Sequence, residues 1–137
     1  MAPRYLIDTD IFIHLRQQRL PQVRARFDRL KPGEAVISTI VYGELLFGAE
    51  KSALPEKALK GIEDLVSLVP VEPLGGAVAR EYGALRASLE KRGAVIGNND
   101  MWIAAHTLAL GLILVTANER EFKRVPKLKV QNWTAGN

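Results

Sequence analysis

Short aliphatic runs alternate with longer helical stretches along the whole chain, and this alternation is the strongest constraint on its fold. The segments predicted to be strands are residues 5–8, 35–38, 67–71, 112–116 and 128–131, the last of them at an edge. Strands that are joined through helices cannot form hairpins, so they must run parallel. The sequence therefore predicts an α/β protein, with three α/β/α layers and a five-stranded, mainly parallel sheet.

The predicted helices have recognisable beginnings and ends. Thr9 or Asp10 caps the first, Ser38 or Thr39 caps the third, and Gly111 supplies a left-handed stop. The helices expected from spacing and caps are residues 10–17, 21–30, 39–51, 55–66, 74–92, 98–110 and 119–124. The chain has 137 residues without an internal repeat or linker, so we expect one domain over residues 1–137.

Three carboxylates stand alone in apolar runs. Asp8 ends the run Tyr5-Leu6-Ile7, Glu44 is the only charge in residues 40–48, and Asp100 is the only charge in residues 94–116. Burying an ionised carboxylate costs several kcal/mol unless a partner compensates it. No Lys or Arg within these runs could pair with them, so a divalent cation such as Mg²⁺ is the simplest partner.

The predicted topology brings these acids to one edge of the sheet. Asp8 and Thr116 lie at the carboxyl ends of strands, where open parallel sheets bind ligands. Glu44 and Asp100 lie near the beginnings of helices that start at that edge. Helix capping and the helix dipole are the simpler explanations for Asp8 and Asp100. A fourth acid is expected from Glu119 or Glu121, and the sequence does not choose between them.

The charge balance favours a polyanionic partner. The chain has 19 Lys and Arg against 15 Asp and Glu; with four acids assigned to a metal site, 19 against 11 remain, or +8. Candidate RNA contacts are Arg16, Arg19 and Arg24, for which a solvated helix face is the alternative. The chain contains no cysteine, which excludes disulfides and thiolate zinc sites. No apolar run reaches roughly 18 residues, and we expect a cytoplasmic protein without a membrane association.

Four blocks of sequence, in this order and spacing, resemble the PIN-domain ribonucleases, and among them the VapC toxins of bacterial toxin–antitoxin pairs. The blocks are residues 6–10, 38–50, 99–106 and 114–122. The resemblance implies a PIN-like fold and a Mg²⁺- or Mn²⁺-dependent endoribonuclease activity. It also implies a homodimer and a VapB-type antitoxin that inserts into the active-site groove, with DNA contacted only through the antitoxin.

The resemblance assigns roles to individual residues. Asp8, Glu44 and Asp100 match the family's acids, and Glu121 matches a variable fourth acid at which Asp is commoner. The polar residues expected to support them are Thr9, Thr116 and Asn118. Residues 50–52 and 124–126 resemble VapC proteins that cut initiator tRNA in its anticodon stem-loop.

Three functions remain to be separated. The leading hypothesis is metal-dependent hydrolysis of RNA, in which water attacks in line and leaves a 5′-phosphate and a 3′-hydroxyl. A haloacid-dehalogenase-like phosphatase that uses Asp8 as nucleophile and Asp10 as acid is the second. A non-catalytic module that binds RNA or protein is the third. Phosphatase activity without RNA cleavage favours the second, and absence of Mg²⁺-dependent stabilisation favours the third.

Overall fold

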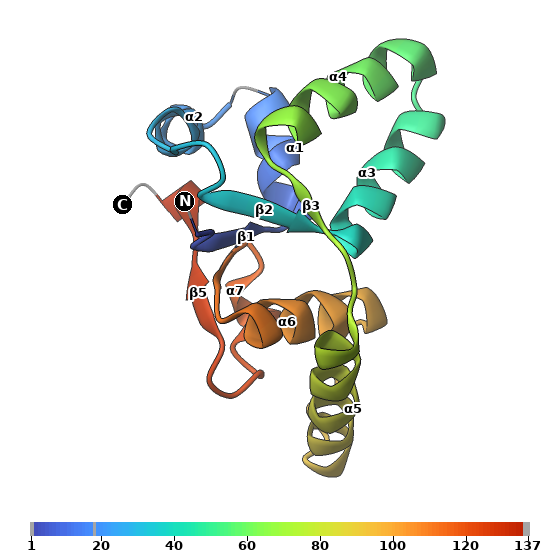
Figure 1. Cartoon of the computed structure of the whole chain (residues 1–137), viewed down its shortest axis with the longest axis vertical. Coiled ribbons are helices and arrows are strands. Elements are labelled where there is room, and N and C mark those ends of the chain that lie inside the picture. The colour runs from blue at the N-terminus through green and yellow to red at the C-terminus, as the bar shows by residue number, and fades with distance from the viewer. Residues whose placement is uncertain (1, 18, 136–137) are drawn as a thin grey trace.

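The computed structural model describes residues 2–17 and 19–135, and in them a parallel sheet separates two groups of helices (Figure 1). The five strands lie in the order β3-β2-β1-β4-β5, and every neighbouring pair is parallel. The strands are β1 Tyr5–Ile7, β2 Ala35–Ser38, β3 Val71–Glu72, β4 Ile113–Val115 and β5 Lys129–Gln131. The predicted α/β class with a five-stranded parallel sheet is confirmed.

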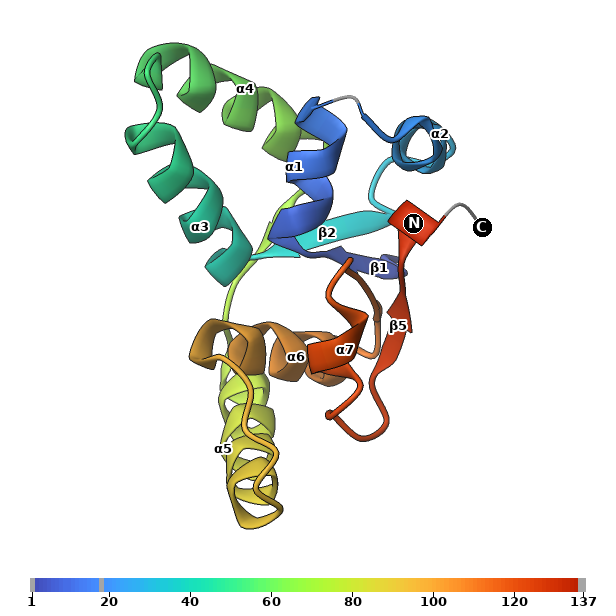
Figure 2. The same ribbon diagram turned by 180° about the vertical axis from the view of Figure 1, so that it is seen from behind.

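Helices cover both faces of this sheet. The helices are α1 Thr9–Gln17, α2 Pro21–Asp28, α3 Thr39–Glu50, α4 Pro55–Leu68, α5 Gly76–Lys91, α6 Asn98–Leu110, α7 Glu119–Phe122 and the 3₁₀ helix η1 Trp133–Ala135. The first four lie on one side of the sheet, and α5, α6 and α7 lie on the other (Figures 1 and 2). None of the helices in the described ranges is both long and apolar enough to cross a bilayer.

The third strand was placed too early by the sequence prediction. Ser67 and Leu68 belong to α4, and β3 comprises only Val71 and Glu72. The helix continues to Leu68, and the Val69 N–H then donates to the Leu65 carbonyl, before Pro70 interrupts the backbone. Aliphatic residues over 65–69 suit either a strand or a helix, so their spacing alone was ambiguous. The helix η1 was not predicted.

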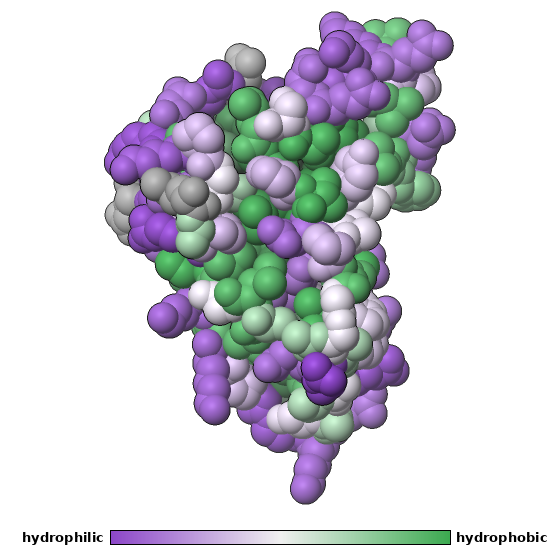
Figure 3. Space-filling model, viewed as in Figure 1, coloured by the Kyte–Doolittle hydropathy of each residue, from purple (hydrophilic) through white to green (hydrophobic). Residues whose placement is uncertain are grey.

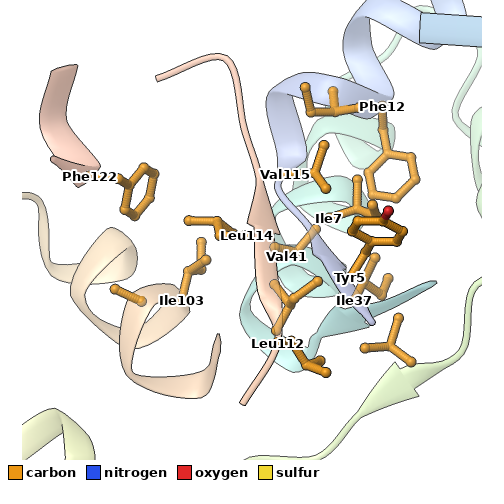
Figure 4. Packing of buried hydrophobic residues seen from close by; sticks show 14 of the residues in the cluster. Tyr5, Ile7, Phe12, Ile37, Val41, Ile103, Leu112, Leu114, Val115 and Phe122 are labelled. Carbon is orange, nitrogen blue, oxygen red and sulfur yellow. The ribbon is translucent and has the colours of Figure 1, made fainter. Parts of the chain in front are cut away.

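The central strands are buried on both faces. Leu114 points toward Ile103 and Phe122 on the side of α6 and α7, whereas Val115 points toward Phe12 on the other (Figure 4). Leu6 and Ile7 of β1 are fully buried as well. Continuous apolar runs, rather than alternating ones, are expected in strands that helices cover on both sides. This packing fixes the carboxyl ends of β1 and β4 side by side.

A polar contact between helices links the two halves of the molecule. Ser38 ends β2 and caps α3, since its Oγ accepts from the Ile40 N–H at 3.1 Å. The same Oγ lies 2.8 Å from Nδ1 of His106 on α6. His106 is fully buried, its Nε2 has no hydrogen-bond partner within the described residues, and burial lowers its pKa. A neutral His106 therefore holds α6 against the beginning of α3.

We predict that Ser38→Ala destabilises the protein by about 2 kcal/mol, because it removes a helix cap and leaves both ring nitrogens of His106 unbonded. Thermal or urea unfolding measures the change. Ser52→Ala is the matched control, since the Ser52 Oγ also accepts a backbone N–H, from Leu54 at 3.2 Å, but at the surface. It should cost about 0.5 kcal/mol or less. Equal losses in the two variants would contradict a role for the buried contact.

Candidate active site

Asp8 lies at the end of β1, where the neighbouring strand β4 supplies its partners. The Asp8 N–H donates to the Val115 carbonyl at 2.8 Å, which continues the parallel ladder by one step. The Thr116 hydroxyl donates to Asp8 Oδ2 at 2.8 Å, and the Thr9 N–H donates to Oδ1 at 2.8 Å. Asp8 is only 6% exposed. Its carboxylate is therefore held in one orientation at the edge of the sheet.

Glu44 joins this carboxylate through Thr9. The Thr9 hydroxyl donates to Glu44 Oε1 at 2.6 Å, which connects the first residue of α1 to the second turn of α3. Glu44 is half-buried, and its negative charge contributes to raising the pKa of Asp8. Thr9 therefore places a second acid beside the first, although the two are 36 positions apart in the chain.

Asp100 and Glu121 form a second acidic pair. Asp100 lies in the first turn of α6, and Glu121 lies on α7. The Gly97 N–H donates to Glu121 Oε1 at 2.7 Å, and the Asn118 amide donates to Oε2 at 2.8 Å. A Cβ atom on Gly97 would stand 3.5 Å from Asp100 Oδ2 and 3.6 Å from Glu121 Oε1. The backbone at Gly97 thus lies against both carboxylates.

The structure separates the two candidates for the fourth acid. Glu119 is exposed and accepts a hydrogen bond from the Asn132 amide at 3.2 Å. Glu121 instead turns toward Asp100, and its charge is one cause of the raised pKa of that residue. The geometry places Glu121, and not Glu119, with the other acids.

The four acids share one electrostatic environment. Burial raises the pKa of Asp8 to about 7, and the neighbouring charge of Asp10 adds to this effect. Burial also raises the pKa of Asp100 to about 7, and the charges of Glu121, Asp8 and Glu44 contribute further. The Gly97 backbone bond is the main cause that lowers the pKa of Glu121. The two acidic pairs therefore interact electrostatically.

No ion pair of the described residues involves this cluster. Within the described parts of the chain, the ion pairs are Arg4–Glu34, Arg24–Asp28, Lys60–Asp64 and Arg86–Glu90. None of them involves a residue of the cluster. The excess of negative charge at this edge is left for something outside the chain to balance.

The donor atoms suit a hard divalent cation. All of them are carboxylate, hydroxyl or amide oxygens, which are the ligands that Mg²⁺ and Mn²⁺ prefer. Over residues 2–17 and 19–135, however, no three acidic, His or Cys side chains already stand close enough together to hold one ion. Asp8 with Glu44 and Asp100 with Glu121 stand as two neighbouring pairs. A cation shared by both pairs requires side chains to rotate toward it.

Asp10 is a member of this edge that the sequence prediction treated only as a helix cap or a phosphatase acid. Its oxygens accept from the Ala117 N–H at 3.2 and 3.3 Å, and Oδ2 lies 3.4 Å from the Thr116 hydroxyl. Burial raises its pKa. Asp10 thus ties the first turn of α1 to the loop after β4. The repeated acid in Asp8-Thr9-Asp10 was the signal for it.

The three arginines predicted to contact RNA lie elsewhere. Arg16 and Arg24 line a groove of about 520 Å³ between α1, α4 and the turn before α4, and Arg24 pairs with Asp28. Arg19 is exposed. No hydrogen bond or ion pair in the described chain links these three to the acids. The apolar lining of the groove includes Phe12, Leu15, Leu45, Leu54, Ile62 and Leu65.

Comparison with known proteins identifies the family. Residues 5–128 match the model of the PIN domain. The chain belongs to the PIN-domain family. It is 40% identical over 130 residues to Ribonuclease VapC2 of Haemophilus influenzae, an alignment that covers 95% of this chain and 98% of that protein. It is also 40% identical over 131 residues to the tRNA(fMet)-specific endonuclease VapC of Shigella flexneri, covering 96% and 98%.

A solved PIN-domain structure agrees with this assignment. The chain superposes on a VapC-type chain of the DNA-bound VapBC complex of Salmonella typhimurium with a TM-score of 0.90. The sequence identity is 34%, and the match covers 97% of this chain and 99% of the other. The predicted membership of the PIN-domain ribonucleases of VapC type is confirmed. The roles of the individual acids stay predictions.

We predict that the metal-free protein loses stability as the pH rises from about 4 to 8. The pKa of Asp8 and of Asp100 is about 7 in the folded state, above the value of 3.8 for an unperturbed Asp. Folding therefore favours the protonated acids, and this contribution is fully present below about pH 4 and lost as the pH passes 7. Asp8→Asn should gain on the order of 2 to 4 kcal/mol over the wild type between pH 4 and 8.

Thermal unfolding of the wild type and of Asp8→Asn, in EDTA at about pH 4 and about pH 8, measures the difference in stability between the two proteins. The comparison uses the difference between the two proteins because His106, whose pKa burial lowers, has the opposite pH dependence in both. Glu119→Gln is the control, since Glu119 lies outside the cluster, and its gap should not change with pH. A pH-independent gap for Asp8→Asn would contradict the electrostatic account.

Proposed function

We propose that this chain is a metal-dependent endoribonuclease whose active site is formed by Asp8, Glu44, Asp100 and Glu121. The observation that carries the proposal is the convergence of two acidic pairs, Asp8 with Glu44 and Asp100 with Glu121, at the carboxyl edge of a parallel sheet, where no ion pair of the described residues involves them. The names of its relatives, Ribonuclease VapC2 and tRNA(fMet)-specific endonuclease VapC, support the reaction. We regard residues 1–137 as one PIN domain.

In this proposal Asp8 and Asp100 hold Mg²⁺ or Mn²⁺, and Glu44 and Glu121 complete the acidic ligands. When bound, the cation supplies the positive charge that stabilises the attacked phosphate and the departing oxygen. The chain's own contribution is orientation: the hydroxyls of Thr9 and Thr116 fix carboxylate oxygens that would otherwise turn toward solvent.

Two further residues, Gly97 and His106, bear on how the reaction can proceed. Gly97 leaves open the space beside Asp100 and Glu121 that a Cβ atom would fill. His106 is fully buried, so it does not reach a substrate as a general base. Attack by water rather than by the ribose 2′-hydroxyl should leave a 5′-phosphate and a 3′-hydroxyl.

We propose initiator tRNA, in its anticodon stem-loop, as the RNA target. The name of the Shigella flexneri relative supports this substrate, and so do residues 50–52 and 124–126, which resemble VapC proteins that cut initiator tRNA. Recognition of RNA generally depends on the shape of single-stranded loops. A tRNA substrate also places the activity in the cytoplasm.

We propose that a VapB-type antitoxin inhibits the enzyme and occupies the groove between α1 and α4. Apolar side chains gather there, bordered by hydrophilic ones (Figure 3). Arg16, Arg24 and Lys57 stand at the groove, whose lining contains no acid. An amphipathic segment with acidic residues fits such a surface. We therefore propose that Arg16 and Arg24 contact the antitoxin, whereas the sequence predicted that they contact RNA.

The VapBC structure of Salmonella typhimurium is bound to DNA, which supports an association of the toxin–antitoxin pair with DNA. We propose that DNA contact in such a pair is made by the antitoxin, as the resemblance to VapC toxins implies. The chain itself is proposed to act as a homodimer, as the resemblance to VapC toxins implies.

We predict that the purified protein cleaves a tRNA anticodon stem-loop in Mg²⁺ and not in EDTA. Asp8→Asn and Asp100→Asn should lower the rate at least about 100-fold, because each removes charge at the site where the phosphate is attacked. Gel analysis of end-labelled RNA, with phosphatase and ligase treatment of the ends, gives both rates and end groups.

Glu121→Gln and Glu119→Gln form a matched pair for the fourth acid. They remove the same charge two residues apart, but only Glu121 stands beside Asp100. Cleavage should fall in Glu121→Gln and stay within about threefold of wild type in Glu119→Gln. Full activity in Asp8→Asn would refute the site, and turnover of small phosphate esters without RNA cleavage would favour the phosphatase alternative.

A further inference from the structure

The helix α7 and the turn after it carry three cations on one face. Arg120, Lys123 and Arg124 stand at positions i, i+3 and i+4, which share one side of a helical turn. The turn continues past α7, since the Lys123 N–H donates to the Glu119 carbonyl at 2.9 Å and the Arg124 N–H donates to the Glu121 carbonyl at 3.1 Å. All three cations are exposed.

The opposite side of the same turn is anchored in the core. Phe122 is fully buried and Val125 is 4% exposed, so the turn cannot rotate. Burial of these two residues fixes the direction in which the intervening side chains leave the backbone. The cationic face, defined as Arg120, Lys123 and Arg124, is therefore held outward by the packing beneath it.

This cationic face lies beside the acidic site. Glu121 lies within the same turn and accepts the Gly97 N–H, and α7 lies beside α6 (Figure 2). The Arg124 guanidinium donates to the Val95 carbonyl at 3.0 Å, two residues before Gly97. Arg124 thus stands beside the segment whose Gly97 lies against Asp100 and Glu121.

None of the cations of this face forms an ion pair in the part of the chain that the structure describes. Its ion pairs involve other residues. Glu119, the nearest acid in sequence apart from Glu121, instead accepts from the Asn132 amide. By contrast, Arg24 of α2 is paired with Asp28. The positive charges of the cationic face are therefore available to bind a polyanion.

We propose that Arg120, Lys123 and Arg124 bind the phosphates of the RNA strand adjacent to the cleaved bond, on the side of Asp100 and Glu121. This inference rests on the proposed ribonuclease function. An edge with several carboxylates repels a polyanion, and neighbouring cations offset that repulsion while they set the position of the strand. Contacts to phosphate fix register without reading sequence. The face therefore serves RNA of any sequence, and selectivity arises elsewhere.

The test is RNA binding by protein that does not cleave. Asp8→Asn is combined with Arg120→Gln and Lys123→Gln, since neither of these two side chains makes a hydrogen bond or ion pair in the described residues. Affinity for a fluorescent RNA stem-loop is measured by anisotropy over a range of salt concentrations. Loss of two phosphate contacts should weaken binding about tenfold at low salt and reduce the slope of log K against log salt by about 1.4.

The matched control, the α1 variant, is Asp8→Asn combined with Arg16→Gln in α1 and Arg19→Gln just after it in the chain, which removes the same charge. This control should bind within about twofold of Asp8→Asn, with an unchanged salt slope. Melting temperatures of all three proteins check that they are folded. An unchanged slope in the α7 variant, or a loss confined to the α1 variant, would overturn the proposal.

Cleavage by otherwise wild-type protein separates this proposal from the function on which it rests. With the α7 face changed, KM should rise about tenfold while kcat stays near its original value, because uniform binding is lost and the acids are untouched. Absence of cleavage by the unmodified protein contradicts the proposed function itself. Normal cleavage by the unmodified protein with unchanged KM in the α7 variant contradicts only the role of the α7 face.

Discussion

The uncompensated negative charge around Asp8 is the constraint on which the rest of the site depends. The carboxylate is 6% exposed, is held by Thr9 and Thr116, and has a pKa raised to about 7. An isolated buried charge is costly, and the protein retains it without a basic partner among its described residues. Under the proposed function a bound cation would offset this cost, and binding and catalysis would then depend on the same side chains.

The parallel sheet is what brings such charges together. Strand β1 delivers Asp8 and strand β4 delivers Thr116 to the same edge, while α3, α6 and α7 each bring one more acid. Buried contacts hold these helices in place, and the bond between Ser38 and His106 is one of them. Strand order and helix packing therefore fix, relative to one another, residues that are separated by up to about a hundred positions in the chain.

Sequence reasoning succeeded where one local signal was sufficient. The sheet, most helices and the isolation of Asp8 were predicted from short sequence patterns. Ser67 was wrongly assigned to a strand, because the aliphatic residues around it suit a strand or a helix. Asp10 was taken for a cap because its bond to the Ala117 N–H joins segments over a hundred residues apart. Only three-dimensional packing distinguishes Glu121 from its neighbouring acid. Tertiary contacts of this kind leave no mark in local spacing.

Anomalous diffraction from a crystal soaked in Mn²⁺ tests the central claim most directly. The account predicts one or two strong peaks at the edge of the sheet, with oxygens of Asp8 and Asp100 at roughly 2.0 to 2.3 Å and with Glu44 or Glu121 rotated toward the ion. Peaks confined to other parts of the surface, with these acids unmoved and bonded only to Thr9, Thr116 and Gly97, would contradict it.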